Sequence, residues 1–238
     1  MQNKTKKIIL IGLASAVLLV LTSAIIIRSI RKNRGAKVKN KNPKKILIVG
    51  DSQSAIETAN GGKISYTYPN LLRERLKDKG VTIDVVAIVG KTTDWMKKNL
   101  ASKLKDKKYD RVIIYGGGND TSNASIKLET TLNNIQQMVD MARENGADAF
   151  VNLGYKVQGD FGNYKIMPIT PYITEREKWI PYVEKRKQLQ KLIPQKIKNA
   201  TIIPAYDLQS KTSDGIHPTA SGHKIVAENI YDSIVKKY

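Results

Sequence analysis

The stretch KILIVGDS, residues 45–52, places four consecutive apolar side chains directly before a glycine, an acid and a serine. A short aliphatic, β-branched run that stops at glycine is typical of a strand buried on both faces of a parallel sheet. Four further runs of this kind occur at 83–89, 112–115, 149–151 and 201–203. Each of them stops at, or a few residues before, a glycine or proline, and we expect a strand at every one.

Amphipathic segments alternate with these runs. Their apolar residues recur every three or four positions, the spacing of one helix face. The positions are Tyr68, Leu71, Leu72 and Leu76, then Leu128, Leu132, Ile135, Val139 and Ala142, and finally Val226, Ile230 and Ile234. Alternation of strands and helices predicts an α/β domain with a parallel sheet covered on both faces. Ligands of such sheets bind outside the carboxyl ends of the strands.

The composition limits the class of protein. The chain has 238 residues, a formal net charge of +20 and 41% hydrophobic residues, which excludes a fully disordered chain and a polytopic membrane protein. It contains no cysteine, so disulfides, a thiol nucleophile and Cys-based zinc sites are excluded. With two histidines, His217 and His223, a multi-histidine metal cluster is not expected.

The N-terminal part differs from the rest. Residues 8–27 form a run of 20 residues without a charge, bounded by Lys7 and Arg28. As a helix this run would extend about 30 Å, the thickness of a bilayer's hydrocarbon core. A cleaved signal peptide is the alternative, with Thr22-Ser23-Ala24 as a weak cleavage site. We expect a short tail at 1–7 and an uncleaved transmembrane helix or signal-anchor at 8–27.

Residues 28–45 carry nine basic residues and no acid, which predicts an extended, self-repelling linker before a domain at 46–238. The linker would attract anionic lipid, at about 1 kcal/mol per basic residue near the surface. It could equally bind another anionic polymer, or act only as a spacer.

The positive-inside rule would keep the domain in the cytoplasm. A short tail followed at once by an apolar span is instead typical of a signal-anchor, and we expect an extracytoplasmic domain.

Short polar motifs follow the predicted strands. They are Gly50-Asp51-Ser52 after the first, Gly90 after the second, Gly117-Gly118-Asn119-Asp120 after the third and Asp214-Gly215-Ile216-His217 after the last. Because the carboxyl ends of parallel strands share one edge of the sheet, the four motifs should gather there.

The gathered residue types suit acyl transfer. A serine hydroxyl needs a base to take its proton, and His217 can act as that base for Ser52. Asp214, three residues earlier, can orient the imidazole ring. The backbone amides of Ser52 and Gly90 and the side-chain amide of Asn119 can donate to a developing oxyanion.

The four motifs, in this order, resemble the signature blocks of the SGNH (GDSL-type) hydrolase superfamily over residues 45–238. The resemblance implies a flavodoxin-like, three-layer α/β/α fold and a serine esterase that needs no metal or cofactor. It implies Ser52 as nucleophile, His217 as base and Asp214 as its orienting acid, with an oxyanion hole of Ser52, Gly90 and Asn119. Gln53 departs from the pattern, because many members carry leucine or isoleucine there, and this weakens assignment to the lipases.

Other interpretations of the same residues are weaker. Ser52 alone could cap a helix. A dinucleotide fingerprint fails because Thr121 stands where its third glycine is required, and a P-loop ending at Gly90 fails because Val85 stands at its first glycine. We expect His223 to be structural. The basic residues of 191–198 are interpreted as a solvated face, so nucleic acid is not an expected partner.

The long interval from Gly154 to Pro181 is rich in aromatic residues and is interpreted either as a loop that shapes a groove for sugars or acyl chains or as plain surface packing. The sequence thus predicts a membrane-tethered esterase acting on an acyl ester, with an O-acetyl group on a cell-envelope glycan as the substrate we favour. A lipase or thioesterase, an acyltransferase using the same site, and a non-catalytic basic module on a degenerate scaffold are the alternatives.

Overall fold

The computed structural model describes residues 42–58, 60–156, 176–208, 211–212 and 216–236. All of them belong to one compact unit, Ala36–Tyr238. The predicted tail, the transmembrane segment at 8–27 and most of the linker at 28–45 lie outside the described residues, so these boundaries stay predictions. None of the helices described is both long enough and apolar enough to cross a bilayer.

Five parallel strands form one sheet in the order β2-β1-β3-β4-β5. Their bounds are β1 Lys45–Gly50, β2 Thr82–Ala87, β3 Arg111–Tyr115, β4 Asp148–Asn152 and β5 Thr201–Ile203. The apolar runs therefore predicted every strand of this sheet. In the register of β1 and β3, Gly50 lies opposite Tyr115, so both central strands end at the same edge.

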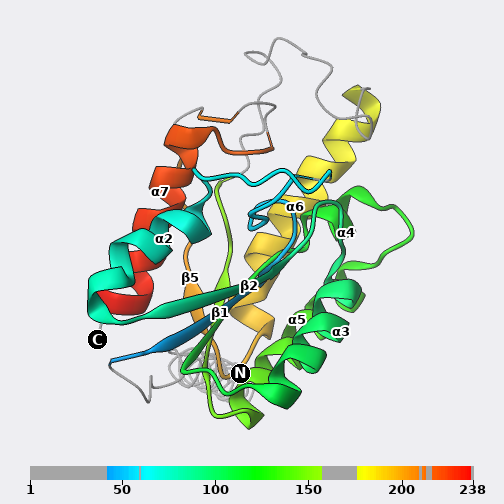
Figure 1. Ribbon diagram of the computed structural model, residues 1–238. Coiled ribbons are helices and arrows are strands. Elements are labelled where there is room, and N and C mark those ends of the chain that lie inside the picture. Colours follow the sequence, from blue (N-terminus) through cyan, green and yellow to red (C-terminus); the bar gives the residue numbers. More distant parts are fainter. Residues whose placement is uncertain (1–41, 59, 157–175, 209–210, 213–215, 237–238) are drawn as a thin grey trace, which may run out of the picture. The chain divides into compact units, whose positions relative to one another are not determined.

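Helices cover both faces of the sheet, as Figure 1 shows. The helices α2 (Tyr68–Leu76) and α7 (Ala220–Tyr231) pack with Ile46, Ile48 and Ile113 on one face. The helices α3 (Thr93–Asp106), α5 (Leu128–Glu144) and α6 (Arg176–Lys196) pack with Leu47, Val49 and Val112 on the other. Alternate residues of each strand thus enter opposite cores, which confirms the three-layer α/β/α fold. The shorter elements are η1 (Lys77–Lys79), α4 (Gly118–Ser122) and η2 (Asp232–Lys236).

Two expectations about element bounds are wrong. The strand predicted at 83–89 ends at Ala87, because Ala87 pairs with Gly50, the last residue of β1. Ile88 and Val89 are consequently exposed, by 48% and 40%. The interval expected as a loop up to Pro181 already enters α6 at Arg176, so Pro181 lies inside that helix. Residues 157–175 of this aromatic interval lie outside the described residues.

The strand order determines where a site can form. From β1 the chain leads to β2, toward one edge strand of the sheet, and from β3 it leads to β4, toward the opposite edge strand. The loops after β1 and β3 therefore diverge, and the gap between their carboxyl ends is the position at which open α/β sheets bind ligands.

Candidate active site

Ser52 stands directly beyond β1. Its hydroxyl oxygen lies 3.0 Å from His217 Nε2, although 165 residues separate the two in the sequence. Both side chains are partly exposed, so a substrate can reach them. Gly50 permits the sharp turn into Ser52, because a Cβ at position 50 would lie 2.4 Å from Ser54 Oγ and 2.7 Å from the Tyr115 carbonyl oxygen.

Local hydrogen bonds fix the turn that carries Ser52. The backbone N–H of Gln53 donates to Asp51 Oδ1 at 3.0 Å, and the N–H of Ser54 donates to the Asp51 carbonyl at 3.0 Å. The Ser54 hydroxyl bonds in turn to Tyr68 of α2 at 2.7 Å. Asp51 is therefore a structural residue of the turn.

The loop that bears His217 is held on both sides. After His217, Pro218 forms an isolated bridge with Thr212, and the Thr219 hydroxyl caps α7 by accepting from Gly222 N–H. Before His217, the carbonyl oxygen of Ile216 accepts from the Gln53 side chain and the Tyr155 hydroxyl. Asp214, the predicted orienting acid, lies outside the described residues, and its role stays a prediction.

Gly90 and Asn119 are linked through a neighbour. Asn119 Nδ2 donates to the carbonyl of Lys91 at 2.9 Å, which ties the loop after β3 to the loop of Gly90. Gly90 has a φ of +75°, a conformation that favours glycine, and a Cβ there would meet nothing within 4 Å. The need for glycine at this position is thus conformational within the chain itself. Any steric demand for it would come from a bound substrate.

A second link joins the same two loops below the surface. Asp120 is 1% exposed, and its carboxylate accepts from the Thr93 N–H at 2.9 Å and from the Thr93 hydroxyl. The Thr131 hydroxyl donates to the same carboxylate at 3.3 Å. Asp120 therefore anchors the start of α3, which follows Gly90, to α4, which carries Asn119. The sequence showed Asp120 only as part of a motif, not as this anchor.

The turn of Ser52 contains the buried carboxyl of Asp51, and Arg186 and His223 are buried near it. Burial raises the pKa of the Asp51 carboxyl, while the Gln53 N–H and the Arg186 guanidinium act in the opposite direction. Arg186, on α6, is 6% exposed and had no distinguishing signal in the sequence, because it is one of many basic residues.

On the α7 side, His223 accepts from the Tyr68 N–H at 3.3 Å. Burial, and then the nearby His217, lower the pKa of His223 to about 4, in keeping with a structural role.

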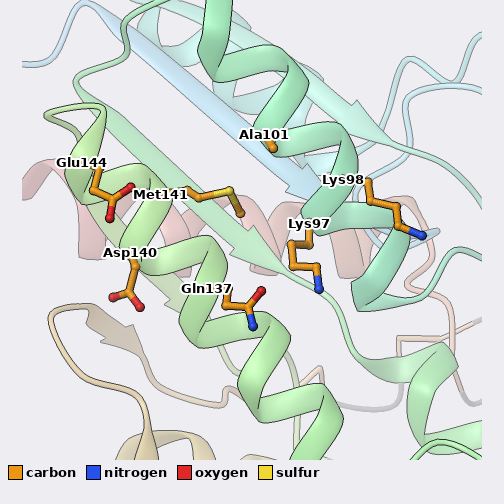
Figure 2. A pocket seen from close by; sticks show the side chains of 7 residues that line it. All are labelled: Lys97, Lys98, Ala101, Gln137, Asp140, Met141 and Glu144. Atoms are coloured by element: carbon orange, nitrogen blue, oxygen red, sulfur yellow. The ribbon is translucent and has the colours of Figure 1, made fainter.

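Apart from this pair, the described residues show no metal cluster but do form a surface depression. Within the part of the chain that the structure describes, no group of three or more His, Cys, Asp or Glu could hold a metal ion. A depression of about 430 Å³ opens between α3 and α5. Figure 2 shows Lys97 and Lys98 on its α3 side and Asp140 and Glu144 on its α5 side. Its lining includes none of the predicted site residues, and charges of both signs favour neither anions nor cations.

Comparison with solved structures shows the same fold. The chain is similar to TesA (24% identity, TM-score 0.59, covering 80% of this chain and 98% of TesA). It is similar to the psychrotrophic esterase EstA from Pseudoalteromonas sp. (19% identity, TM-score 0.55, 82% and 97% covered). A catalytic mutant of Axe2, an acetylxylan esterase from Geobacillus stearothermophilus, gives a TM-score of 0.62 at 15% identity, with 85% and 96% covered.

Comparison of the sequence itself identifies the family. None of the curated proteins matches the chain significantly. Residues 48–225, however, match the GDSL-like Lipase/Acylhydrolase family. This range extends from β1 into α7 and so contains every residue predicted for the site. The chain therefore belongs to the GDSL-like lipase/acylhydrolase family and is an enzyme of its esterase class.

Proposed function

We propose that this protein is a membrane-tethered serine esterase that hydrolyses an acyl ester through an acyl-Ser52 intermediate. The observation that carries the proposal is the 3.0 Å contact between Ser52 Oγ and His217 Nε2. This is the distance at which an imidazole can take the proton of an attacking hydroxyl.

The reaction follows from this pair. His217 Nε2 accepts the Ser52 proton as Oγ forms a bond to the ester carbonyl carbon, and the carbonyl oxygen becomes an oxyanion. The C–O bond to the alcohol then breaks, and the alcohol oxygen takes the proton from His217. Water attacks the acyl-Ser52 ester by the same route, giving the free acid and restoring the serine. Asp214 is proposed to orient the ring during both steps.

Three donors are proposed to stabilise the oxyanion. The backbone N–H groups of Ser52 and Gly90 donate to no acceptor among the described residues. Asn119 uses its amide nitrogen to donate to Lys91, and an amide nitrogen carries a second N–H. Donors that are fixed in place and unused within the fold cost little reorganisation when charge develops on the substrate.

The proposed substrate is an O-acetyl group on a cell-envelope glycan. An apolar segment at 8–27 and a basic linker at 28–45 would hold the domain beside an anionic surface. Aromatic residues between 154 and 181 suit sugar rings. The likeness in fold to an acetylxylan esterase is consistent with this substrate class. We propose a single-pass membrane protein with its catalytic domain outside the cytoplasm, in contact with anionic lipid or polymer through the linker.

Ester hydrolysis tests the chemistry. The wild type should release p-nitrophenol from p-nitrophenyl acetate and acetate from acetylated glycan, and Ser52→Ala should lose at least about 10³-fold in rate. Ser102→Ala, a substitution on the exposed side of α3, is the matched control and should match the wild type. Equal rates in wild type and Ser52→Ala would refute the mechanism.

Covalent labelling tests the location. A membrane-impermeant fluorophosphonate should label Ser52 in intact cells as strongly as in lysed cells. Labelling that requires lysis would place the domain in the cytoplasm. A wild type that is never labelled would favour the non-catalytic module instead.

A further inference from the structure

We propose that Gln53 and Tyr155 are positioning residues that jointly hold the backbone carbonyl of Ile216, and through it the ring of His217, within reach of Ser52. The inference rests on the proposed function, because it concerns how that site keeps its base in place. Neither residue has a role in the chemistry described above.

Two donors meet at one acceptor. Gln53 Nε2 donates to the Ile216 carbonyl oxygen at 3.0 Å, across 163 residues of sequence. The Tyr155 hydroxyl donates to the same oxygen, across 61 residues. A carbonyl oxygen has two lone pairs and can accept both bonds. Since Ile216 immediately precedes His217, this oxygen lies on the peptide unit that leads into the base.

Both donors stand on fixed backbone at the edge of the sheet. Gln53 follows β1, and its N–H is bonded to Asp51. Tyr155 follows β4 and forms a parallel bridge with Tyr206, in which Tyr206 N–H donates to Gly154 and Lys156 N–H to Tyr206. The base loop is thereby fastened to the ends of two different strands, one of which also carries the nucleophile.

The environment of Gln53 argues against a role in packing alone. Its side chain is 7% exposed, and its Oε1 has no hydrogen-bond partner among the described residues. A buried polar atom without a partner destabilises the folded state. An apolar side chain of similar size would fill this position without that cost. What the glutamine adds is the one hydrogen bond to the Ile216 carbonyl.

The expected consequence is kinetic. A misplacement of about 1 Å in a reacting group can cost about 10²-fold in rate. Because either donor alone still holds the carbonyl, removing one should cost little, while removing both should free the Ile216–His217 peptide unit to shift. Substrate affinity should hardly change, because neither donor is proposed to contact the substrate.

The test is a double-mutant cycle in the full-length protein with p-nitrophenyl acetate. Gln53→Met removes the amide at nearly constant size, and Tyr155→Phe removes only the hydroxyl. We expect each single variant to lose about threefold in kcat and the double variant about 10²-fold, with KM within about twofold of the wild type. Fluorophosphonate titration of Ser52 gives the competent fraction, so kcat is counted per active site. Thermal melting reports whether each variant is folded.

Matched controls remove the same groups elsewhere. Gln136→Met deletes an amide on α5 that donates to Asp140, and Tyr109→Phe deletes a hydroxyl that donates to Asp84. Both should retain the wild-type kcat.

The outcomes separate the two proposals. A double-variant loss equal to the product of the single losses, or a loss confined to KM, overturns the positioning role and leaves the esterase proposal standing. If the double variant does not fold, the single variants decide, because an unchanged kcat in both overturns the inference. A wild type that neither hydrolyses ester nor labels at Ser52 refutes the proposed function itself.

Discussion

Replacing His223 by glutamine should remove much of the acid sensitivity of this fold. His223 is 6% exposed, and burial lowers its pKa from 6.5 to about 4. Between these two values the unfolded chain binds a proton at His223 that the folded chain does not. The free energy of unfolding therefore falls as the pH falls through this window, and above pH 6.5 the group has no effect.

The magnitude follows from the two pKa values. At about 1.4 kcal/mol per pKa unit, the difference between 6.5 and about 4 corresponds to about 3 kcal/mol of lost stability at the acid end. Glutamine cannot be protonated in this range, and its Oε1 can accept from the Tyr68 N–H that now donates to His223. At pH 7.5 the variant should therefore lie within about 1 kcal/mol of the wild type.

Urea unfolding of the full-length protein, followed by circular dichroism at pH 7.5 and pH 4, measures both quantities. The wild type should lose about 3 kcal/mol more than His223→Gln between the two pH values. Carboxylates that titrate in this range contribute to both proteins and cancel in the comparison. Parallel losses in the two proteins would refute the claim that His223 is held neutral by burial.

Three further substitutions test the loop after β3, its link to α3 and the turn of the nucleophile. Asn119→Ala should lower kcat by about 10²- to 10³-fold, and steady-state kinetics that show only a raised KM would contradict its proposed role. Asp120→Asn weakens the buried bonds to Thr93 and should cost about 1.5–3 kcal/mol in urea unfolding, whereas an unchanged midpoint would show that the anchor is dispensable. Gly50→Ala should cost about 1–3 kcal/mol and reduce fluorophosphonate labelling, because its Cβ would lie 2.4 Å from Ser54 Oγ. Wild-type labelling and stability would show that the turn can relax.

The strands could be predicted because a parallel sheet buries both faces of each strand. Runs such as 46–49 and 112–115 are therefore continuously apolar, and this pattern is local. The bounds of β2 were less predictable, since they depend on where its neighbour β1 ends. The helix α6 was not predicted at all: Pro181 and Pro194 lie inside it, and proline in a sequence normally signals an interruption.

The sequence by itself predicted the fold class, the family resemblance and the meeting of Ser52 with His217, because the loops after parallel strands gather at one edge of the sheet. Only the tertiary structure decided which side chains support that pair. The bond that Gln53 donates to Ile216 spans 163 residues, and the bond that Thr93 donates to Asp120 joins two separate helices. Contacts of this kind leave no periodic pattern along the chain. They arise from the relative placement of elements, which is set by the packing of the whole core.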